Sequence, residues 1–296
     1  MDGMTPKLWL PARRDGRLVN AMSVDVEDYF HAQALGIGRH RWDRMEARVE
    51  NNTRRILDLL DEAKVSATFF VLGWVAQRHP GLVRHIVGAG HELASHGWDH
   101  SRVDSQTPEQ FRADIRRSKA LLEQTAGVPV HGYRAATFSI SHRTPWAFSV
   151  LAEEGFAYSS SVYPVRHDYY GMPDAPRFAF HPLGGTAFEE YPMTSVRVGN
   201  RNLPCGGGGY FRLLPYAFSH WAMQRINTHD RQPCIFYFHP WEIDSAQPRQ
   251  SGLPLKSRLR HYTNLDRMER RVRRLLGDFA WDRIDRVLLD APVPSH

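Results

Sequence analysis

Residues 92–100 read Glu92-Leu93-Ala94-Ser95-His96-Gly97-Trp98-Asp99-His100. A short apolar run that ends at a glycine predicts a strand that turns sharply at its end. The two histidines stand four residues apart, so their imidazoles can converge on one divalent ion if the segment between them makes a single turn. Two neutral imidazoles alone bind such an ion weakly, and a carboxylate oxygen would complete one face of the site.

Carboxylates stand in a second stretch, Ser23-Val24-Asp25-Val26-Glu27-Asp28, which follows an apolar start. Three acidic side chains are more than a single metal ligand needs, so one of them is free to act as a base. A His-x-x-x-His pair is by itself a weak motif, because the chain holds 16 histidines and such spacings arise by chance. The metal-site hypothesis therefore depends on the rest of the chain.

The composition is that of a globular protein, with 42% hydrophobic and 24% charged residues in 296 positions. Barrels of this length fold around a single core. The two cysteines, Cys205 and Cys234, are too few for a disulfide scaffold and form no Cys-x-x-Cys pair. The sequence has no run of about eighteen apolar residues and no leader pattern, so we expect no transmembrane segment and a cytoplasmic location.

The net charge of +6 and the pI near 9.5 suggest some affinity for anions. The arginines are scattered, apart from a run between Arg267 and Arg274. That run is typical of the solvated face of a late amphipathic helix, and no base-reading motif accompanies it. Nucleic acid is therefore not predicted as a partner.

The order of elements indicates a parallel sheet with helices outside it. Strands are predicted at residues 20–26, 65–72, 91–96, 131–134, 156–160 and 233–239. Helices are predicted at residues 42–64, 80–89, 107–127, 144–154, 214–227 and 265–276. Thr107-Pro108-Glu109-Gln110 is a helix start. Residues 164–209 break the alternation and predict hairpins or a long loop, and residues 240–263 are predicted to be irregular.

Polar residues end several of the predicted strands, namely Asp25, His96, Arg134 and His239. Parallel strands put their carboxyl ends on one face, so all four side chains can meet there. The run Gly206-Gly207-Gly208-Gly209 lacks the Lys-Ser/Thr of a phosphate-binding loop and predicts a flexible turn that lets the backbone approach substrate.

These motifs, in this order, resemble the polysaccharide deacetylase family of carbohydrate esterases. The resemblance rests on Asp25-Val26-Glu27-Asp28, Ser95-His96-Gly97-Trp98-Asp99-His100, Gly132-Tyr133-Arg134-Ala135, Tyr158-Ser159-Ser160-Ser161-Val162-Tyr163-Pro164 and Phe238-His239-Pro240-Trp241-Glu242. It covers the chain from about Asn20 onward. Residues 205–216 and the C-terminal third resemble the subgroup associated with exosortase-linked exopolysaccharide clusters.

The resemblance implies an α/β fold, a distorted (β/α) barrel with fewer than eight strands, a loop or hairpin insertion and a C-terminal helical extension. The expected organisation is a lead-in at residues 1–19, a catalytic barrel at 20–240 with the insertion at 164–212, and an extension at 241–296 packed on the same domain. Ser159 stands where the family usually has Asp, which puts that residue's part in shaping the groove, but not catalysis, in question.

The resemblance also implies catalytic roles. Asp25 would be the general base, oriented by Arg134, and His239 would protonate the leaving nitrogen. In a strand Glu27 faces the same side as Asp25, whereas a turn that begins at Glu27 would bring Asp28 inward. Both carboxylates stay open as the third metal ligand beside the two histidines, with a slight preference for Asp28.

The implied cofactor is a divalent metal, zinc first, with Co, Ni, Fe or Mn as alternatives. The implied reaction is hydrolysis of N-acetyl groups on a polysaccharide or its precursor in exopolysaccharide biosynthesis, with association with the synthesis machinery as a further expectation. Four aromatic residues beside the motifs are candidates for stacking on sugar rings: Tyr133, Trp98, Trp241 and Tyr163. The alternatives are a small-molecule amidohydrolase and a catalytically silent glycan-binding protein.

Overall fold

The computed structural model describes residues 5, 6 and 11–289. The remaining parts of the predicted lead-in and of the C-terminal extension, residues 1–4, 7–10 and 290–296, lie outside the described residues. In the described part of the chain, no helix is long and apolar enough to span a membrane.

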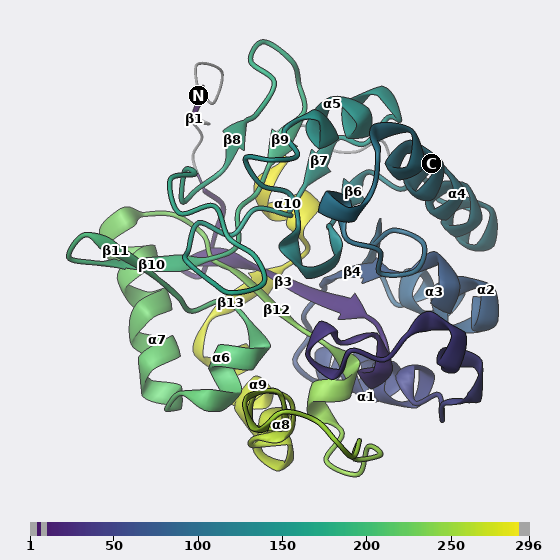
Figure 1. Ribbon diagram of the computed structural model, residues 1–296. Helices are drawn as coiled ribbons and strands as arrows, with labels where there is room; N and C mark the ends of the chain where they lie inside the picture. Colours follow the sequence, from purple (N-terminus) through teal and green to yellow (C-terminus); the bar gives the residue numbers. More distant parts are fainter. Residues whose placement is uncertain (1–4, 7–10, 290–296) are drawn as a thin grey trace.

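A curled sheet forms the centre of the molecule (Figure 1). Its main path contains consecutive parallel strands in the order β12 (Ile235–Phe238), β3 (Arg17–Val26), β4 (Thr68–Val71), β5 (Glu92–Ser95), β6 (Gly132–Tyr133), β7 (Tyr158–Ser159) and β9 (Glu189–Glu190). Strand β8 (Phe180–His181) pairs antiparallel with β9, and β1 (Thr5–Pro6) pairs antiparallel with β8. This arrangement confirms the predicted distorted α/β barrel.

Strand β3 lies between β4 and β12 and is the longest of the sheet. Alternate residues along a strand point to opposite faces, and in β3 Met22, Val24 and Val26 pack in the larger hydrophobic core. Val19 and Ala21 pack in a second core with residues from β4, β5 and β12. The alternation places Asp25 on the same face as Ala21, at the carboxyl end of the strand.

Helices flank the sheet, with α1–α5 along one side and α6–α9 along another (Figure 1). The α-helices are α1 (Val49–Glu62), α2 (Gly73–Arg78), α3 (Pro80–Gly88), α4 (Pro108–Ala126), α5 (Trp146–Glu153), α6 (Gly208–Leu213), α7 (Tyr216–Arg225), α8 (Leu255–Tyr262), α9 (Leu265–Asp278) and α10 (Ile284–Leu288). Short 3₁₀ helices are η1 (Tyr29–His31), η2 (Gln33–Leu35), η3 (Arg39–Arg44), η4 (Val103–Ser105), η5 (Ala136–Phe138) and η7 (Pro240–Ile243), and a π-helix, η6 (Ile226–Asp230), follows α7.

The predicted start of α4 is confirmed. Thr107 and Gln110 form a reciprocal capping box, and Gly127 ends the helix in the left-handed conformation with φ of 69°. Helix α1 begins at Val49 rather than near residue 42, because residues 39–44 form η3. Helix α8 lies in the stretch that was predicted to be irregular, and α2 and α6 were not predicted.

The region predicted as an insertion is only partly separate from the barrel. Strands β10 (Ser195–Val198) and β11 (Arg201–Pro204) form the expected hairpin, but β9 joins the parallel sheet. Near the C-terminus, β13 (Ala280–Asp282) pairs with the first half of β3, which β2 (Arg13–Arg14) flanks as a hairpin. Trp281 of β13 is buried in the larger core.

Candidate active site

Three potential metal ligands meet at the carboxyl edge of the sheet. Donor atoms of Glu27, His96 and His100 all lie within 4.8 Å of one another. Glu27 follows β3 and His96 follows β5, and the loop after β5 turns back through Gly97 (φ 77°) and His100 (φ 59°). The left-handed conformation at both positions folds the loop tightly. We call these three residues the ion-binding triad.

Hydrogen bonding leaves one nitrogen of His96 available for a ligand bond. Its Nδ1 lies 2.8 Å from the backbone oxygen of Arg134. A carbonyl oxygen can only accept, so Nδ1 carries the proton and Nε2 keeps its lone pair. Burial lowers the pKa of His96 to about 4, which keeps the ring neutral.

Glu27 contributes a charged oxygen to the triad. Burial alone would raise its pKa, but its interactions with the imidazoles of His100 and His239 outweigh burial and lower the pKa well below its usual range. Its Oε2 lies 2.9 Å from Nε2 of His100, in a geometry that is not that of a hydrogen bond. Two buried electron-pair donors at this distance call for a proton or a cation between them.

Asp28, the slightly preferred third ligand, does not reach the histidines. Its Oδ1 accepts the backbone NH of Tyr29 at 2.9 Å, and its Oδ2 accepts those of Arg48 and Val49 at 2.6 and 2.9 Å. Asp28 therefore caps η1 and holds the start of α1. The preference for Asp28 is corrected: backbone NH groups occupy both of its oxygens, whereas Glu27, whose NH bonds to the backbone oxygen of Asp25 at 3.0 Å, lies beside the two histidines.

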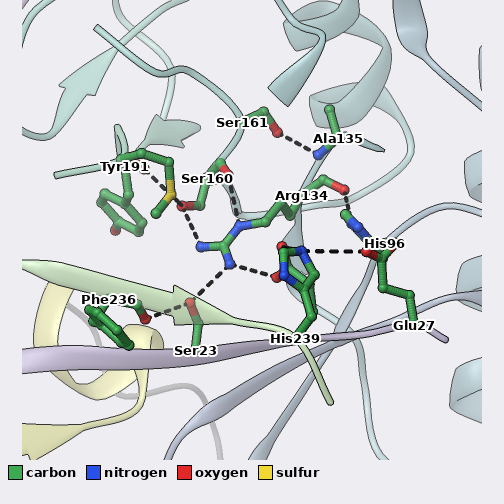
Figure 2. Close-up of polar contacts among 12 residues, drawn as sticks. Ser23, Glu27, His96, Arg134, Ala135, Ser160, Ser161, Tyr191, Phe236 and His239 are labelled. Carbon is green, nitrogen blue, oxygen red and sulfur yellow. Dashed lines mark hydrogen bonds and ion pairs between the residues drawn. The ribbon is translucent and has the colours of Figure 1, made fainter. Parts of the chain in front are cut away.

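A buried ion pair holds the candidate base. Asp25 Oδ1 accepts a hydrogen bond of 2.7 Å from Arg134, whose side chain is 0% exposed. The guanidinium also donates to Ser23 Oγ at 2.9 Å and to the backbone and hydroxyl oxygens of Ser160 at 3.1 and 3.0 Å (Figure 2). It lies 4.0 Å from the ring centre of Phe70. The buried guanidinium of Arg134 thus fixes the orientation of the Asp25 carboxylate.

His239, at the end of β12, faces both carboxylates. Its Nε2 lies 3.4 Å from Glu27 Oε1 and 3.9 Å from Asp25 Oδ2. Burial would lower the pKa of His239, but Glu27, Glu242 and Asp25 outweigh burial and raise the pKa to about 9. The ring stacks on Trp241 with centroids 5.1 Å apart. A protonated imidazole in this position can donate a proton.

The sequence did not reveal what holds His239. Its Nδ1 lies 3.1 Å from Oε2 of Glu242, and Glu242 Oε1 accepts a hydrogen bond of 2.9 Å from Arg212. Both partners are buried, and Arg212 also donates to the backbone oxygens of residues 260, 261 and 263. We call His239, Glu242 and Arg212 the donor relay. The only sequence signal was the acidic residue three positions after His239.

The glycine run has a packing role at Gly207 and Gly208, and it begins α6 rather than forming the predicted flexible turn. A Cβ at Gly208 would lie 2.0 Å from Glu242 Oε2, and one at Gly207 would lie 2.6 Å from the ring of Tyr237. Gly209 lines the cavity described below. The run therefore lets α6 approach β12 and bring Arg212 to Glu242.

One cavity of about 1010 Å³, including space open to solvent, contains the triad, Asp25 and the donor relay. Of the four aromatic residues predicted to bind substrate, Trp241 lines it. The other three are corrected: Tyr133 packs edge-on against Phe111 and Phe156, Trp98 packs on Gly73 under Arg117, and Tyr163 is buried behind Tyr170. The aromatic lining that the sequence did not reveal is Phe138, His167, Tyr169, Tyr170, Tyr210 and Tyr237.

Ser159, at the family's usual Asp position, lies away from this lining. Its hydroxyl donates to Ser161 Oγ at 2.7 Å, and Ser161 Oγ accepts the backbone NH of Ala135 (Figure 2). A carboxylate from the next strand, Glu190, accepts the backbone NH groups of Ser161 and Val162 at 2.8 and 2.7 Å. Ser159, in place of the family's Asp, is thus part of a buried hydrogen-bond network.

Two family models match different parts of the chain. The family model described as polysaccharide deacetylase matches residues 41–156, and a domain of unknown function (DUF3473) matches residues 160–289. The peptidoglycan-N-acetylglucosamine deacetylase PgdA of Listeria monocytogenes is 40% identical over 78 residues. These residues are 26% of this chain and only 17% of that relative's length.

Two solved structures share the fold over most of the chain. A candidate polysaccharide deacetylase from Mycobacterium smegmatis is 21% identical with a TM-score of 0.58, covering 96% of this chain and 93% of its own. A CE4 family pseudoenzyme from Bacillus anthracis is 12% identical with a TM-score of 0.50, covering 93% of this chain and 66% of its own. The family model thus identifies residues 41–156 as polysaccharide deacetylase sequence, and the two solved structures show that the fold extends over most of the chain.

Proposed function

We propose that this protein is a metal-dependent N-deacetylase acting on an N-acetylated polysaccharide or its precursor. The observation that carries the proposal is the convergence of three separate functions in one cavity: an ion-binding triad, a fixed carboxylate base and a buried proton donor. Each group alone occurs in many proteins, but amide hydrolysis needs all three together.

The triad fits a divalent cation. Two imidazole nitrogens and one carboxylate oxygen within 4.8 Å form the donor set of an open site, and zinc, Co, Ni, Fe and Mn all accept such ligands. The close approach of Glu27 Oε2 to His100 Nε2 is the feature that such a cation would relieve. When bound, the cation would supply a Lewis acid that polarises the acetyl carbonyl and acidifies water.

The remaining steps belong to side chains of this chain. Asp25, oriented by Arg134, accepts a proton as the oxygen of water bonds to the acetyl carbon. His239 Nε2 then gives its proton to the sugar nitrogen as the carbon–nitrogen bond breaks. The products are acetate and a free amine on the sugar. Glu242 keeps the imidazole turned towards the cavity by accepting from Nδ1.

The cavity supports a glycan over a small metabolite. Its aromatic lining is suited to stacking on sugar rings, and the PgdA relative is named for peptidoglycan N-acetylglucosamine. A role in exopolysaccharide biosynthesis, the exosortase-linked subgroup, an association with the synthesis machinery and a cytoplasmic location stay predictions from the sequence.

A catalytically silent glycan-binding role is the second candidate. The Bacillus anthracis pseudoenzyme has the same fold, so the fold alone does not decide activity. In this chain, however, the triad, the base and the donor are all present in one cavity.

The test is acetate release from N-acetylglucosamine oligomers by the full chain, before and after removal of metal by a chelator. We expect activity that the chelator abolishes and that added zinc restores. Binding of the oligomers without acetate release under every metal would establish the silent role. Release that persists in metal-free protein would contradict metal dependence.

A further inference from the structure

The outward face of α8 is apolar in the middle and basic at its sides. Leu255 and Leu259 are 68% and 55% exposed, and residues four apart lie on the same face of a helix. Lys256 and Arg258, both exposed, flank this pair. Exposed leucines in the middle of a basic face are typical of helices that lie at a membrane surface.

The charge around α8 is one-sided. Residues 245–264 contain four basic side chains, Arg249, Lys256, Arg258 and Arg260, and no acidic residue. One acid from elsewhere, Asp168, accepts hydrogen bonds from Lys256 and Arg260. The stretch therefore keeps an excess of positive charge that an anionic surface would complement.

Helix α9 is the richest in arginine, but it differs from α8 in how its charges are paired and its apolar residues are buried. Arg273 pairs with Glu62 and Glu269, and Arg274 pairs with Asp278. The large apolar residues of α9 are buried, as Met268 and Val272 are. Net charge is thus present on both helices, but only α8 combines unbalanced charge with exposed leucines.

The face of α8 that carries Leu255 and Leu259 lies beside the mouth of the cavity. Arg260 and His261, on the other side of α8, line the cavity, and so does Leu213 at the end of α6, which is 42% exposed. Helices α6 and α8 are in contact. Three of the five exposed large hydrophobic residues in the described part of the chain are therefore on α6 and α8: Leu213, Leu255 and Leu259.

We propose that α8 docks on the surface of an anionic lipid bilayer, with its leucines in the interface and Arg249, Lys256 and Arg258 near the headgroups. Docking in this way would place the cavity mouth beside the membrane, where a membrane-held substrate could enter. The docking surface itself does not depend on the proposed deacetylase activity, so it can fail or succeed separately.

The test is co-sedimentation of the full chain with vesicles of equal parts phosphatidylcholine and phosphatidylglycerol, compared with vesicles of phosphatidylcholine alone. We expect binding to the anionic vesicles, with a strong loss at high salt. Arg258→Ala should weaken binding by about fivefold, the effect of one basic residue near such a surface. The double variant Leu255→Ser/Leu259→Ser should weaken it further.

Matched controls lie elsewhere on the surface. Trp221→Ser removes an apolar side chain of α7 that is 45% exposed, and Arg270→Ala removes an exposed arginine of α9; both should bind as the wild type does. Equal losses in the controls and the α8 variants would show attraction by net charge only and would overturn the proposal. A wild-type chain that does not bind to anionic vesicles would also overturn the proposal. Acetate release from soluble oligomers should be unchanged in all four variants, because none of these residues lines the cavity.

Discussion

The ion-binding triad and the donor relay face each other across one cavity, yet they are built differently. The triad residues follow the ends of β3 and β5, and His96 is held by the backbone of Arg134, which follows the neighbouring strand β6. The donor relay passes from β12 through η7 to α6 and then to the loop after α8. Strand order and the tight loop after β5 place the triad, whereas a buried ion pair places the donor.

The donor relay and the two histidines of the triad also lie in different family matches. His96, His100 and Arg134 lie in the part that matches the polysaccharide deacetylase model, and the donor relay lies in the part that matches a domain of unknown function. The second part also supplies Trp241, Tyr169, Tyr170 and most of the other aromatic lining of the cavity. The second part therefore supplies the donor relay and most of the aromatic lining, whereas Asp25 and Glu27 precede both matched parts.

The largest effect is expected in the triad. Glu27→Gln keeps the shape of the side chain but removes its charge, so bound zinc should fall well below one ion per chain and acetate release should be lost. Asp28→Asn is the matched control and should keep its metal, although the weakened caps cost about 1 kcal/mol of stability. Metal analysis of both purified variants tests this prediction. If Asp28→Asn loses its zinc and Glu27→Gln keeps it, Asp28 is the ligand instead.

The next largest effect is expected at the base. Asp25→Asn keeps its size and can still accept from Arg134, but it cannot take a proton from water. Turnover should fall by about 10²–10⁴, with metal content close to that of the wild type. Steady-state kinetics together with metal analysis test this prediction. Loss of the metal along with the activity would instead make Asp25 a ligand.

A smaller effect on turnover is expected in the donor relay. Glu242→Gln removes the charge that holds His239 and leaves Arg212 buried without its counter-ion. By analogy with other residues that orient a reacting group, kcat should fall by about 10–100-fold with little change in metal content. Breaking a buried pair also costs about 3–5 kcal/mol of stability.

Asp230→Asn is the control for the donor relay, because it breaks the remote ion pair with Arg177 and should change stability alone. Urea unfolding and kcat, measured on both variants, separate the two effects. A Glu242→Gln variant with unchanged kcat and KM would reduce the relay to a structural role.

The smallest effect on turnover is expected at the opposite end of the barrel. Burial and the nearby charge of Asp285 together raise the pKa of Glu92 from 4.5 to about 8. The folded state keeps this proton after the unfolded chain has released it, so the free energy of unfolding should fall as pH rises from about 5 to about 8. Glu92→Gln should flatten this slope in urea unfolding without changing metal content. An equally steep slope in the variant would mean that another group titrates.

The local features of this protein follow from its sequence. The alternation along β3, the capping box of α4 and the polar residues at strand ends are readable because periodicity and caps depend on neighbours within a few positions. Parallel strands bring their carboxyl ends together, so the predicted strand order was enough to place Asp25, His96, Arg134 and His239 in one site.

Contacts between distant parts of the chain required the tertiary structure. The choice of Glu27 over Asp28 depended on where the chain leaves the extended conformation, and on the NH groups of Arg48 and Val49, about twenty residues away, that occupy Asp28. Arg212 meets Glu242 across thirty positions, and no periodic signal links them. The aromatic residues of the cavity were misjudged because proximity to a motif does not determine which face a side chain takes. That choice is made by packing against distant elements, as Tyr133 packs under α4 and Trp98 packs on Gly73.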